Sequence, residues 1–250
     1  MYPLPVDSYV LVAGSACTVS LAPMNAITDG LWTAPASASA LIFDCDGTLA
    51  DTMPTHYVAW TTMLEAHGIP FSQQRFYELA GMPSERIVEL LSDESGVAVG
   101  DIVSMVNTKE SIYLQSIAEM RRIDVVCEIA LRYHGLLPLA VASGGERAVV
   151  NATVGAIGLT HIFDAVVGAE DTERHKPEPD VFIEAARRLG AEPAGCFVFE
   201  DSDLGLIAAE RAGMTGVDIR PWLLPDIVSQ AVKSPLPPDP QPHSKPATNS

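Results

Sequence analysis

One short stretch, residues 41–52, constrains the fold of this 250-residue chain more than any other. Its apolar start, Leu41 to Phe43, predicts a buried strand. Asp44 and Asp46 follow directly, and Gly47 then lets the chain turn away. Side chains two positions apart in a strand point the same way, so both carboxylates can face one small volume. A divalent cation such as Mg²⁺, which prefers carboxylate and carbonyl oxygens, would hold these like charges together. One carboxylate can then act as a nucleophile and the other as an acid/base.

Composition limits the classes of function open to the chain. Apolar residues make up 48% of it, which is enough to bury a substantial core. The formal net charge of -17 argues against a nucleic-acid partner or an anionic membrane, because both require basic protein surface. The same charge would repel an anionic substrate, which would need a metal ion or a buried lysine to bind. The cysteines are widely spaced and form no Cys/His cluster, which favours a reducing, cytoplasmic location.

Changes in composition divide the chain into segments. Residues 1–38 contain no Lys or Arg, so we expect a poorly ordered N-terminal extension; a signal peptide would need a positively charged start. Residues 53–118 show helical periodicity without a strand signal, which predicts an inserted all-helical cap. Residues 39–52 and 119–222 would form the core, and residues 223–250 a Pro-rich, disordered tail. Within the cap we expect a first helix from residue 53 and further helices over residues 72–80, 84–95 and 101–118.

Nearly all-apolar strands alternate with helices after residue 123. This alternation is typical of a parallel sheet that is covered on both faces. We therefore predict an α/β fold, a Rossmann-like doubly wound parallel sheet with the helical cap inserted after its first strand. The later strands are predicted at residues 136–142, 163–168, 195–199 and 215–219, with helices ending near residue 157 and spanning residues 178–189 and 203–212.

Residues suited to chemistry gather at the carboxyl ends of these strands, where open α/β sheets bind ligands. The second strand ends in Ser143-Gly144-Gly145, whose hydroxyl and backbone N–H groups can hold an anion, although Ser143 could also serve only as a helix cap. Lys176 follows the third strand, and Glu200-Asp201 ends the fourth. Together with Asp44 and Asp46, these residues supply a metal site, an anion cradle, a cation and a nucleophile with its acid/base partner. Such a set suits phosphoryl transfer.

These motifs, in this order, resemble those of the haloacid dehalogenase superfamily of phosphohydrolases. The resemblance covers residues 39–220, and a helical insert directly after the first motif is similar to the superfamily's first cap type. The motifs are most similar to the branch that contains β-phosphoglucomutase and fructose-1-phosphate phosphatase. The matching residues are Asp44-Cys45-Asp46-Gly47-Thr48, Ser143, His175-Lys176-Pro177 and Phe199-Glu200-Asp201-Ser202.

The resemblance implies a role for each matching position. Asp44 would attack phosphorus and become an aspartyl phosphate, while Asp46 would protonate the leaving oxygen and then activate water. Mg²⁺ would be held by Asp44, the backbone carbonyl of Asp46 and Asp201, with Glu200 in or beside the coordination sphere. The substrate's phosphate would contact residues of the core and of the cap, for which we name Ser143, Gly144, Lys176, Thr48, His56 and Arg86. Thr48 would also belong to the hinge of the cap, and Ser202 would cap the next helix.

The resemblance also narrows the reaction. Asp46 argues against dehalogenation, and the position of the insert's sole lysine, Lys109, near its far end argues against Schiff-base phosphonate chemistry. A mutase of this branch holds a second phosphate with a cap-loop arginine, and Ser84 occupies that position here, with Arg86 two residues later. We therefore favour a phosphatase acting on a small sugar phosphate such as fructose 1-phosphate, by a chain that is a monomer or a weak dimer. A mutase and a catalytically silent phosphate-binding protein stay open as alternatives.

Overall fold

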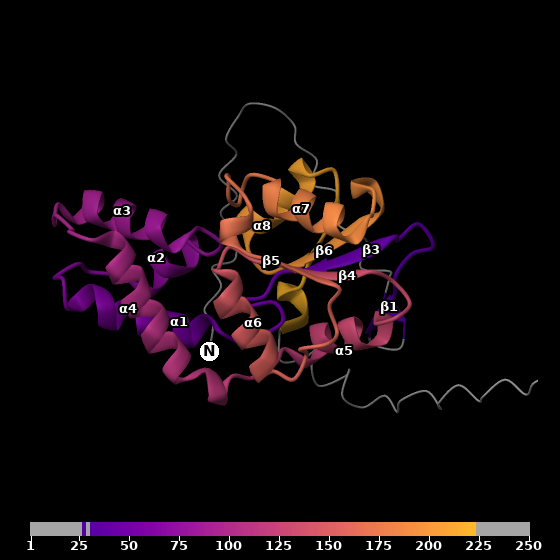
Figure 1. Cartoon of the computed structure of the whole chain (residues 1–250), viewed down its shortest axis with the longest axis horizontal. Helices are drawn as coiled ribbons and strands as arrows, with labels where there is room; N and C mark the ends of the chain where they lie inside the picture. The colour runs from indigo at the N-terminus through magenta and orange to yellow at the C-terminus, as the bar shows by residue number, and fades with distance from the viewer. Residues whose placement is uncertain (1–26, 29–30, 224–250) are drawn as a thin grey trace, which may run out of the picture.

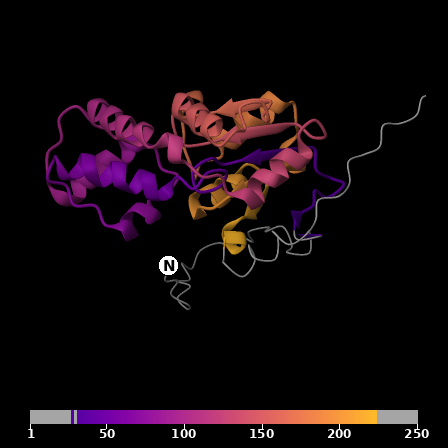
Figure 2. The same ribbon diagram turned by 90° about the horizontal axis from the view of Figure 1, so that it is seen from below.

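The computed structural model describes residues 27–28 and 31–223 (Figure 1). Most of the expected N-terminal extension and nearly all of the expected tail lie outside these residues. Figures 1 and 2 agree in placing helices α1 to α4 at one end of the molecule and the sheet with its covering helices at the other. Within the described residues, we find no helix that is both long and apolar enough to cross a membrane.

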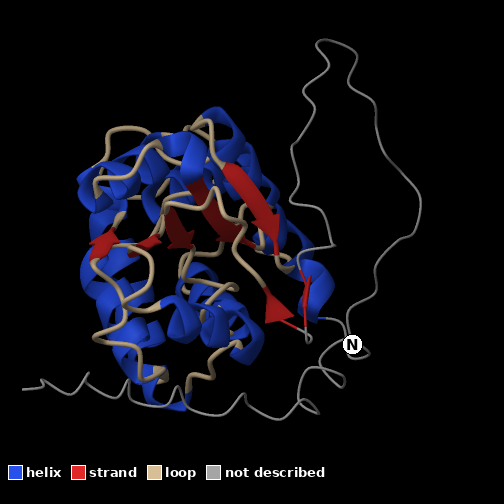
Figure 3. Cartoon of the chain, turned by 90° about the vertical axis from the view of Figure 1, so that its right-hand side faces the viewer, coloured by secondary structure: helices blue, strands red, loops and turns tan. Residues whose placement is uncertain are grey.

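A five-stranded parallel sheet forms the centre of the larger part, with strand order β5-β4-β3-β6-β7. Because the chain first adds strands on one side of β3 and then on the other, the sheet is doubly wound, as predicted. Figure 3 shows the strands between layers of helices. The strands are β3 (Ala40–Phe43), β4 (Leu139–Ala142), β5 (Ala165–Val167), β6 (Cys196–Glu200) and β7 (Thr215–Asp218).

Alternate residues of each strand build two separate cores on the two faces of the sheet. Leu41 and Phe43 belong to the core formed with α5 (Asp124–Tyr133) and α6 (Arg147–Ala156). Ala40 and Ile42 belong to the opposite core, formed with α7 (Asp180–Leu189) and α8 (Asp203–Arg211). Figure 1 shows the two helix pairs on opposite sides of the sheet. Helix α5 was not among the predicted elements, although its buried Val126, Cys127, Ile129 and Ala130 fall at helical spacing.

The remaining helices form a unit with its own apolar core, separate from both faces of the sheet. They are α1 (Met53–Glu65), α2 (Gln73–Glu78), α3 (Ser84–Ser95) and α4 (Ile102–Gln115). Helix α3 begins after Pro83, as expected, and ends at Gly96, which adopts the left-handed conformation. The helix predicted over 101–118 ends earlier, and a short 3₁₀ turn, η2 (Ile117–Glu119), follows it. Three other 3₁₀ turns are η3 (Ala169–Asp171), η4 (Pro193–Gly195) and η5 (Arg220–Leu223).

Part of the expected N-terminal extension packs against the core instead. Strands β1 (Ile27–Thr28) and β2 (Leu31–Trp32) pair in an antiparallel ladder, and only 3% of Trp32 is exposed. The centroid of its ring lies 5.0 Å from that of Phe199, 5.6 Å from that of Phe197 and 6.2 Å from that of Tyr133. The structure differs from the expectation here because one large aromatic side chain fixes a segment whose average composition resembles that of a disordered chain.

Candidate active site

The first and fourth core strands bring their terminal carboxylates together. β3 and β6 are neighbours at the point where the strand order reverses, the position at which doubly wound sheets open a crevice. Phe43 pairs with Phe199, and the N–H of Asp44 donates to the carbonyl oxygen of Phe199 at 3.0 Å. The next residues along both strands are therefore held side by side. These are Asp44, directly after β3, Glu200, the last residue of β6, and Asp201, directly after it.

The resulting cluster has the composition of a divalent-cation site. Asp44, Glu200 and Asp201 each offer a carboxylate oxygen within 4.8 Å of the others. Lys176 lies against the cluster, with its Nζ 2.7 Å from Asp44 Oδ1 and 2.9 Å from Glu200 Oε2. When all are ionised, three carboxylates and one ammonium leave two negative charges uncompensated in a buried volume, which one divalent ion would balance.

The pKa shifts within the cluster also indicate an excess of negative charge. Burial, followed by the charge of Glu200, raises the pKa of Asp44 well above its usual value. Burial and Glu200 also raise the pKa of Asp201 to about 7, against the opposing effects of Thr48 and Lys176. Burial would lower the pKa of Lys176, but Asp44 and Glu200 outweigh it and raise that pKa above its normal range. Without a cation, the cluster therefore tends to retain a proton.

Two residues of the first motif hold Asp201 in place. Gly47 has φ +85°, and a Cβ built there would overlap the carboxylate of Asp201. Glycine is therefore required both for the turn and for this close approach. The Thr48 hydroxyl donates to Asp201 Oδ1 at 2.9 Å, and the Thr48 side chain is fully buried. Among the described residues, Thr48 is not part of the cavity wall. Its hydroxyl instead holds the carboxylate of Asp201, whereas a contact with the substrate's phosphate was expected from the sequence.

Glu200 is the most constrained carboxylate of the three. Its Oε1 accepts from the backbone N–H of Ser202 at 3.1 Å and from the Ser202 hydroxyl at 2.5 Å, and its Oε2 accepts from Lys176. The Ser202 hydroxyl in turn accepts from the N–H of Gly205 at 3.0 Å and caps helix α8, as predicted. Both oxygens of Glu200 are thus already hydrogen-bonded. Asp44 and Asp201, each with one carboxylate oxygen bonded to a side chain, have more capacity to bind a metal ion.

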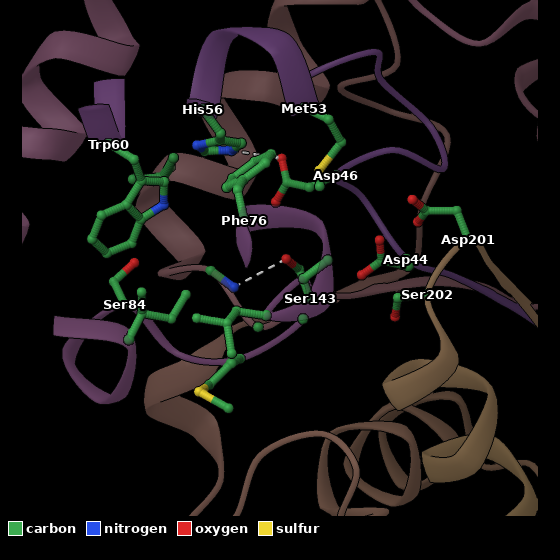
Figure 4. Close-up of a pocket in the computed structure, with 18 of the residues that line it drawn as sticks. Asp44, Asp46, Met53, His56, Trp60, Phe76, Ser84, Ser143, Asp201 and Ser202 are labelled. Carbon is green, nitrogen blue, oxygen red and sulfur yellow. Dashed lines mark hydrogen bonds and ion pairs between the residues drawn. The ribbon is translucent and has the colours of Figure 1, made fainter. Parts of the chain in front are cut away.

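Asp46 points to a different partner. Its Oδ1 lies 3.0 Å from Nε2 of His56, on helix α1, and Figure 4 shows this contact. The His56 ring stacks on Tyr113, with the ring centroids 4.0 Å apart. Burial and the charge of Lys109 lower the pKa of His56, so the ring is neutral near neutral pH and its Nε2–H donates to the carboxylate. Burial alone would raise the pKa of Asp46, but His56 and Thr52 lower it to about 2.

The side chain of Asp46 therefore takes no part in the carboxylate cluster. Its predicted contribution to metal binding, through the backbone carbonyl, stays a prediction.

The end of β4 forms the opposite wall. Ser143 is 1% exposed, and its hydroxyl accepts from the N–H of Gly145 at 3.1 Å. Helix α6 has Glu146 as its N-cap, so the alternative reading of Ser143 as a helix cap is wrong. Ser143 and Gly144 line a cavity of about 90 Å³ together with Asp44, Asp46 and Asp201 (Figure 4). The helical unit closes the far side with mostly apolar side chains, namely Met53, Trp60, Phe76, Leu79, Met82 and Ile87.

Comparison with known proteins identifies the family. Residues 41–219 match the model of the haloacid dehalogenase-like hydrolases. The chain belongs to this family. It is 40% identical over 186 residues to the fructose-1-phosphate phosphatase YqaB of Escherichia coli, covering 73% of this chain and 96% of that protein. It is 28% identical over 200 residues to the β-phosphoglucomutase of Bacillus subtilis, covering 76% of this chain and 88% of that protein.

A solved structure shares the same architecture. A hydrolase from Pseudomonas syringae superposes with a TM-score of 0.67 at 25% identity, covering 77% of this chain and 90% of the other. The predictions of a haloacid dehalogenase-like α/β fold and of an enzyme of the phosphatase class are therefore confirmed.

The structure places two cap residues of this haloacid dehalogenase-like hydrolase differently from the sequence analysis. Lys109 lines the cavity although it lies late in the insert, because α4 packs along α1 and returns the chain to His56. Its Nζ lies 2.8 Å from Glu110 Oε1 and 5.2 Å from the centroid of the Trp60 ring. The signal in the sequence is a lysine on the buried face of a helix, between Val106 and Tyr113.

Arg86 points away from the catalytic cavity. Its side chain is 62% exposed and pairs with Glu89 at 2.8 Å. It lines a second, outer cavity and is not part of the wall that faces Asp44. Ser84, two residues earlier, lies on the wall of both cavities. In this conformation the loop therefore presents a hydroxyl, and not a guanidinium, toward the catalytic residues.

Proposed function

We propose that this chain is a Mg²⁺-dependent phosphatase that hydrolyses a small sugar phosphate through an aspartyl-phosphate intermediate on Asp44. The observation that carries the proposal is the placement of Asp44. One of its oxygens is held by Lys176, and it lies within a buried carboxylate cluster that has a charge deficit suited to a divalent ion. Asp46, held by His56, lines the same cavity.

The metal-binding part of the proposal rests on the donor set. Asp44 and Asp201 would supply carboxylate oxygens and Asp46 its backbone carbonyl, while Glu200 would contribute from beside the ion. These are hard oxygen donors of the kind that Mg²⁺ prefers. When bound, the ion would neutralise charge on the phosphoryl oxygens and on the attacking carboxylate.

The reaction on this chain's own residues would proceed in two displacements. Asp44 attacks phosphorus, the bond from phosphorus to the sugar oxygen breaks, and Asp46 gives that oxygen a proton so that the sugar leaves as an alcohol. Asp46 then takes a proton from a water molecule, which attacks the aspartyl phosphate and releases inorganic phosphate and the free Asp44. Ser143 and Lys176 hold the phosphoryl oxygens throughout.

Asp46 needs a proton for the first displacement. Because its pKa is about 2 in the resting protein, it carries none near neutral pH. The arriving phosphate brings negative charge to the cavity that Asp46 lines, which favours protonation of this carboxylate. His56 keeps the carboxylate oriented toward the cavity during both displacements.

A phosphatase fits the cap loop better than a mutase does. A mutase must bind the second phosphate of a bisphosphate intermediate, and Arg86, in the first turn of α3, is exposed and paired with Glu89. The relative that is 40% identical is named a fructose-1-phosphate phosphatase, which supports a ketose or hexose phosphate as the substrate of this chain.

Phosphate release from a panel of sugar monophosphates, with Mg²⁺ and with a chelator, tests the proposal. The panel includes fructose 1-phosphate and β-glucose 1-phosphate. We expect Mg²⁺-dependent release that Asp44→Asn abolishes and that Asp93→Asn, an exposed carboxylate on α3, leaves unchanged. Formation of glucose 6-phosphate without release would replace the proposal by the mutase. Turnover that survives Asp44→Asn would refute the mechanism, and silence across the panel would favour a phosphate-binding protein.

A further inference from the structure

Glu110 lies where the catalytic cavity meets a larger one. The catalytic cavity, about 90 Å³, is well below the roughly 300–1,000 Å³ of typical ligand pockets. The adjoining outer cavity, about 710 Å³, opens between the cap and the loops that follow β4 and β5. Five residues line both cavities, and Glu110 is the charged one among them; the others are Met82, Ser84, Gly144 and Gly145. A sugar whose phosphate lies at Asp44 and whose tail extends into the outer cavity would pass Glu110.

One oxygen of Glu110 has an open hydrogen-bonding capacity. Oε1 accepts from Lys109 Nζ at 2.8 Å and lies 3.4 Å from the Ser84 hydroxyl. Oε2 is buried and has no partner among the residues that the structure describes, and the side chain as a whole is 12% exposed. A buried carboxylate oxygen requires a donor. A hydroxyl on the tail of a substrate is a donor of the right kind.

The wall of the outer cavity is predominantly acidic. Its charged residues besides Glu110 are Glu85, Arg86, Glu89, Glu146, Glu170 and Lys176, with His175 as a further titratable group. Arg86 is paired with Glu89, and Lys176 with Asp44 and Glu200. Glu170 is partly balanced by Arg147, whose Nη2 lies 3.9 Å from Glu170 Oε1 and whose backbone N–H donates to Oε2 at 3.1 Å. Burial and the charges of Glu110, Glu85 and Glu170 raise the pKa of Glu146, so these carboxylates act on one another across the cavity.

We infer that Glu110 determines substrate specificity: it accepts a hydrogen bond from a hydroxyl of a neutral sugar or polyol tail and repels a second phosphate. The inference rests on the proposed phosphatase function and names its substrate class as monophosphates of neutral, hydroxyl-bearing compounds. The two cavities then differ in the charged groups that they present to the substrate. Lys176 and the metal-binding carboxylates lie at the phosphate end, and Glu110 with its acidic neighbours lies at the tail end. A bisphosphate would bring its second anionic group against this acidic wall.

The test compares matched substrates on matched variants. The substrates are fructose 1-phosphate, fructose 1,6-bisphosphate and phenyl phosphate, which has no hydroxyl tail. The variants are Glu110→Gln, which removes the charge and keeps an acceptor; Glu110→Ala, which removes both; and Glu119→Gln, an exposed control beyond the end of α4. Thermal unfolding of each variant verifies that it is folded.

We expect the wild type to prefer the monophosphate. Glu110→Gln should raise the ratio of kcat/KM for the bisphosphate to kcat/KM for the monophosphate about tenfold, which corresponds to about 1.4 kcal/mol. Glu110→Ala should raise KM for fructose 1-phosphate about tenfold, with kcat changed little, because it removes the acceptor for the tail hydroxyl. Glu110→Ala should change kcat/KM for phenyl phosphate, which has no hydroxyl tail, by less than kcat/KM for fructose 1-phosphate, and Glu119→Gln should match the wild type throughout.

Two results would overturn the inference alone: equal use of the monophosphate and the bisphosphate by the wild type, or the same substrate ratio in Glu110→Gln as in the wild type. In both cases phenyl phosphate would still be hydrolysed, and the proposed function would stand. If the wild type releases phosphate from none of the three substrates, the proposed function fails and the inference fails with it.

Discussion

Removing the charge of Lys176 tests the electrostatic account of the site directly. Lys176→Met keeps most of the methylene stem and removes an ammonium group that is hydrogen-bonded to Asp44 at 2.7 Å and to Glu200 at 2.9 Å and lies 4.9 Å from the centroid of the Phe182 ring. The side chains of all three residues are at least nine-tenths buried. Breaking a buried ion pair by removing one partner costs about 3–5 kcal/mol, because the other partner stays buried without compensation. We expect a loss of this size near pH 7.5.

The loss should depend on pH in a defined direction. The pKa of Asp44 is already raised, and removal of Lys176 raises it further. A carboxyl group with a raised folded-state pKa takes up a proton more readily in the folded protein, so its cost to stability grows as pH rises from its unfolded pKa toward its folded pKa. Protonation of Asp44 as the pH falls therefore relieves part of the cost of its uncompensated charge in the variant. The destabilisation should therefore be smaller at about pH 5 than near pH 7.5.

Urea unfolding followed by circular dichroism, with chelator present, measures both values. Arg211→Met is the control, since Arg211 pairs with Glu178 at the surface, with 47% of its side chain exposed, and its loss should cost less than about 1 kcal/mol. A destabilisation of Lys176→Met that is the same at both pH values would show that packing, and not charge, accounts for the effect. A loss below about 1 kcal/mol would refute the buried ion-pair network altogether.

Three further predictions concern the neighbours of this network. Gly47→Ala should lower the free energy of unfolding in urea by more than Gly68→Ala does. Both glycines have positive φ, but a Cβ at Gly47 overlaps Asp201, whereas a Cβ at Gly68 has no neighbour within 4 Å. Equal losses would show that backbone strain, and not the overlap with Asp201, accounts for the effect. His56→Gln should flatten the pH dependence of stability below pH 6.5. Burial and Lys109 lower the pKa of His56, so the folded wild type resists protonation of this ring and loses stability as the pH falls from 6.5. An unchanged slope of stability against pH in the variant would contradict this account. The affinity for Mg²⁺, measured by titration calorimetry, should fall as the pH drops below about 7, and protons should be released on binding. The reason is that the pKa of Asp201 is about 7 in the metal-free protein. Binding that is independent of pH would exclude this carboxylate as a ligand.

The core of the site was predictable because it depends on strand ends. In a doubly wound sheet, a residue just after a strand lies at the ligand-binding edge, whatever the rest of the chain does. Asp44, Ser143 and Glu200 each lie within one residue of the strand end or form it, so the apolar runs before them were enough to place them together. The neighbouring pairing of β3 with β6 then brought Asp201 to Asp44.

The role of Thr48 could not be obtained in this way. It depends on a hydrogen bond to Asp201, a residue that is 153 positions away along the chain. The sequence motif gives the position of the threonine but not the direction in which its hydroxyl donates.

The cap residues that face the catalytic cavity were harder to predict from the sequence. Helical periodicity tells which face of a helix is buried, but it does not tell what that face packs against. Lys109 lies on the buried face of α4 with Met105, Val106 and Tyr113, and the same pattern would arise if the face met only other cap helices. The packing of α4 along α1 decides that this face also reaches the catalytic cavity.

Specificity and catalysis in this chain are therefore encoded in different ways. The catalytic carboxylates sit on strand ends whose positions follow from the sheet, so they are compatible with any phosphate ester that reaches them. The residue that we infer to select among esters, Glu110, lies on a helix, where a change of one side chain would alter the charge of the cavities without moving Asp44 or Lys176. Its Oε1 is hydrogen-bonded to Lys109 and lies 3.4 Å from the Ser84 hydroxyl, and Glu110 lies on the wall of both cavities. Under the proposed function we therefore expect substitutions on α4 and on the loop before α3 to change the substrate preference while the carboxylate cluster and its lysine stay as they are.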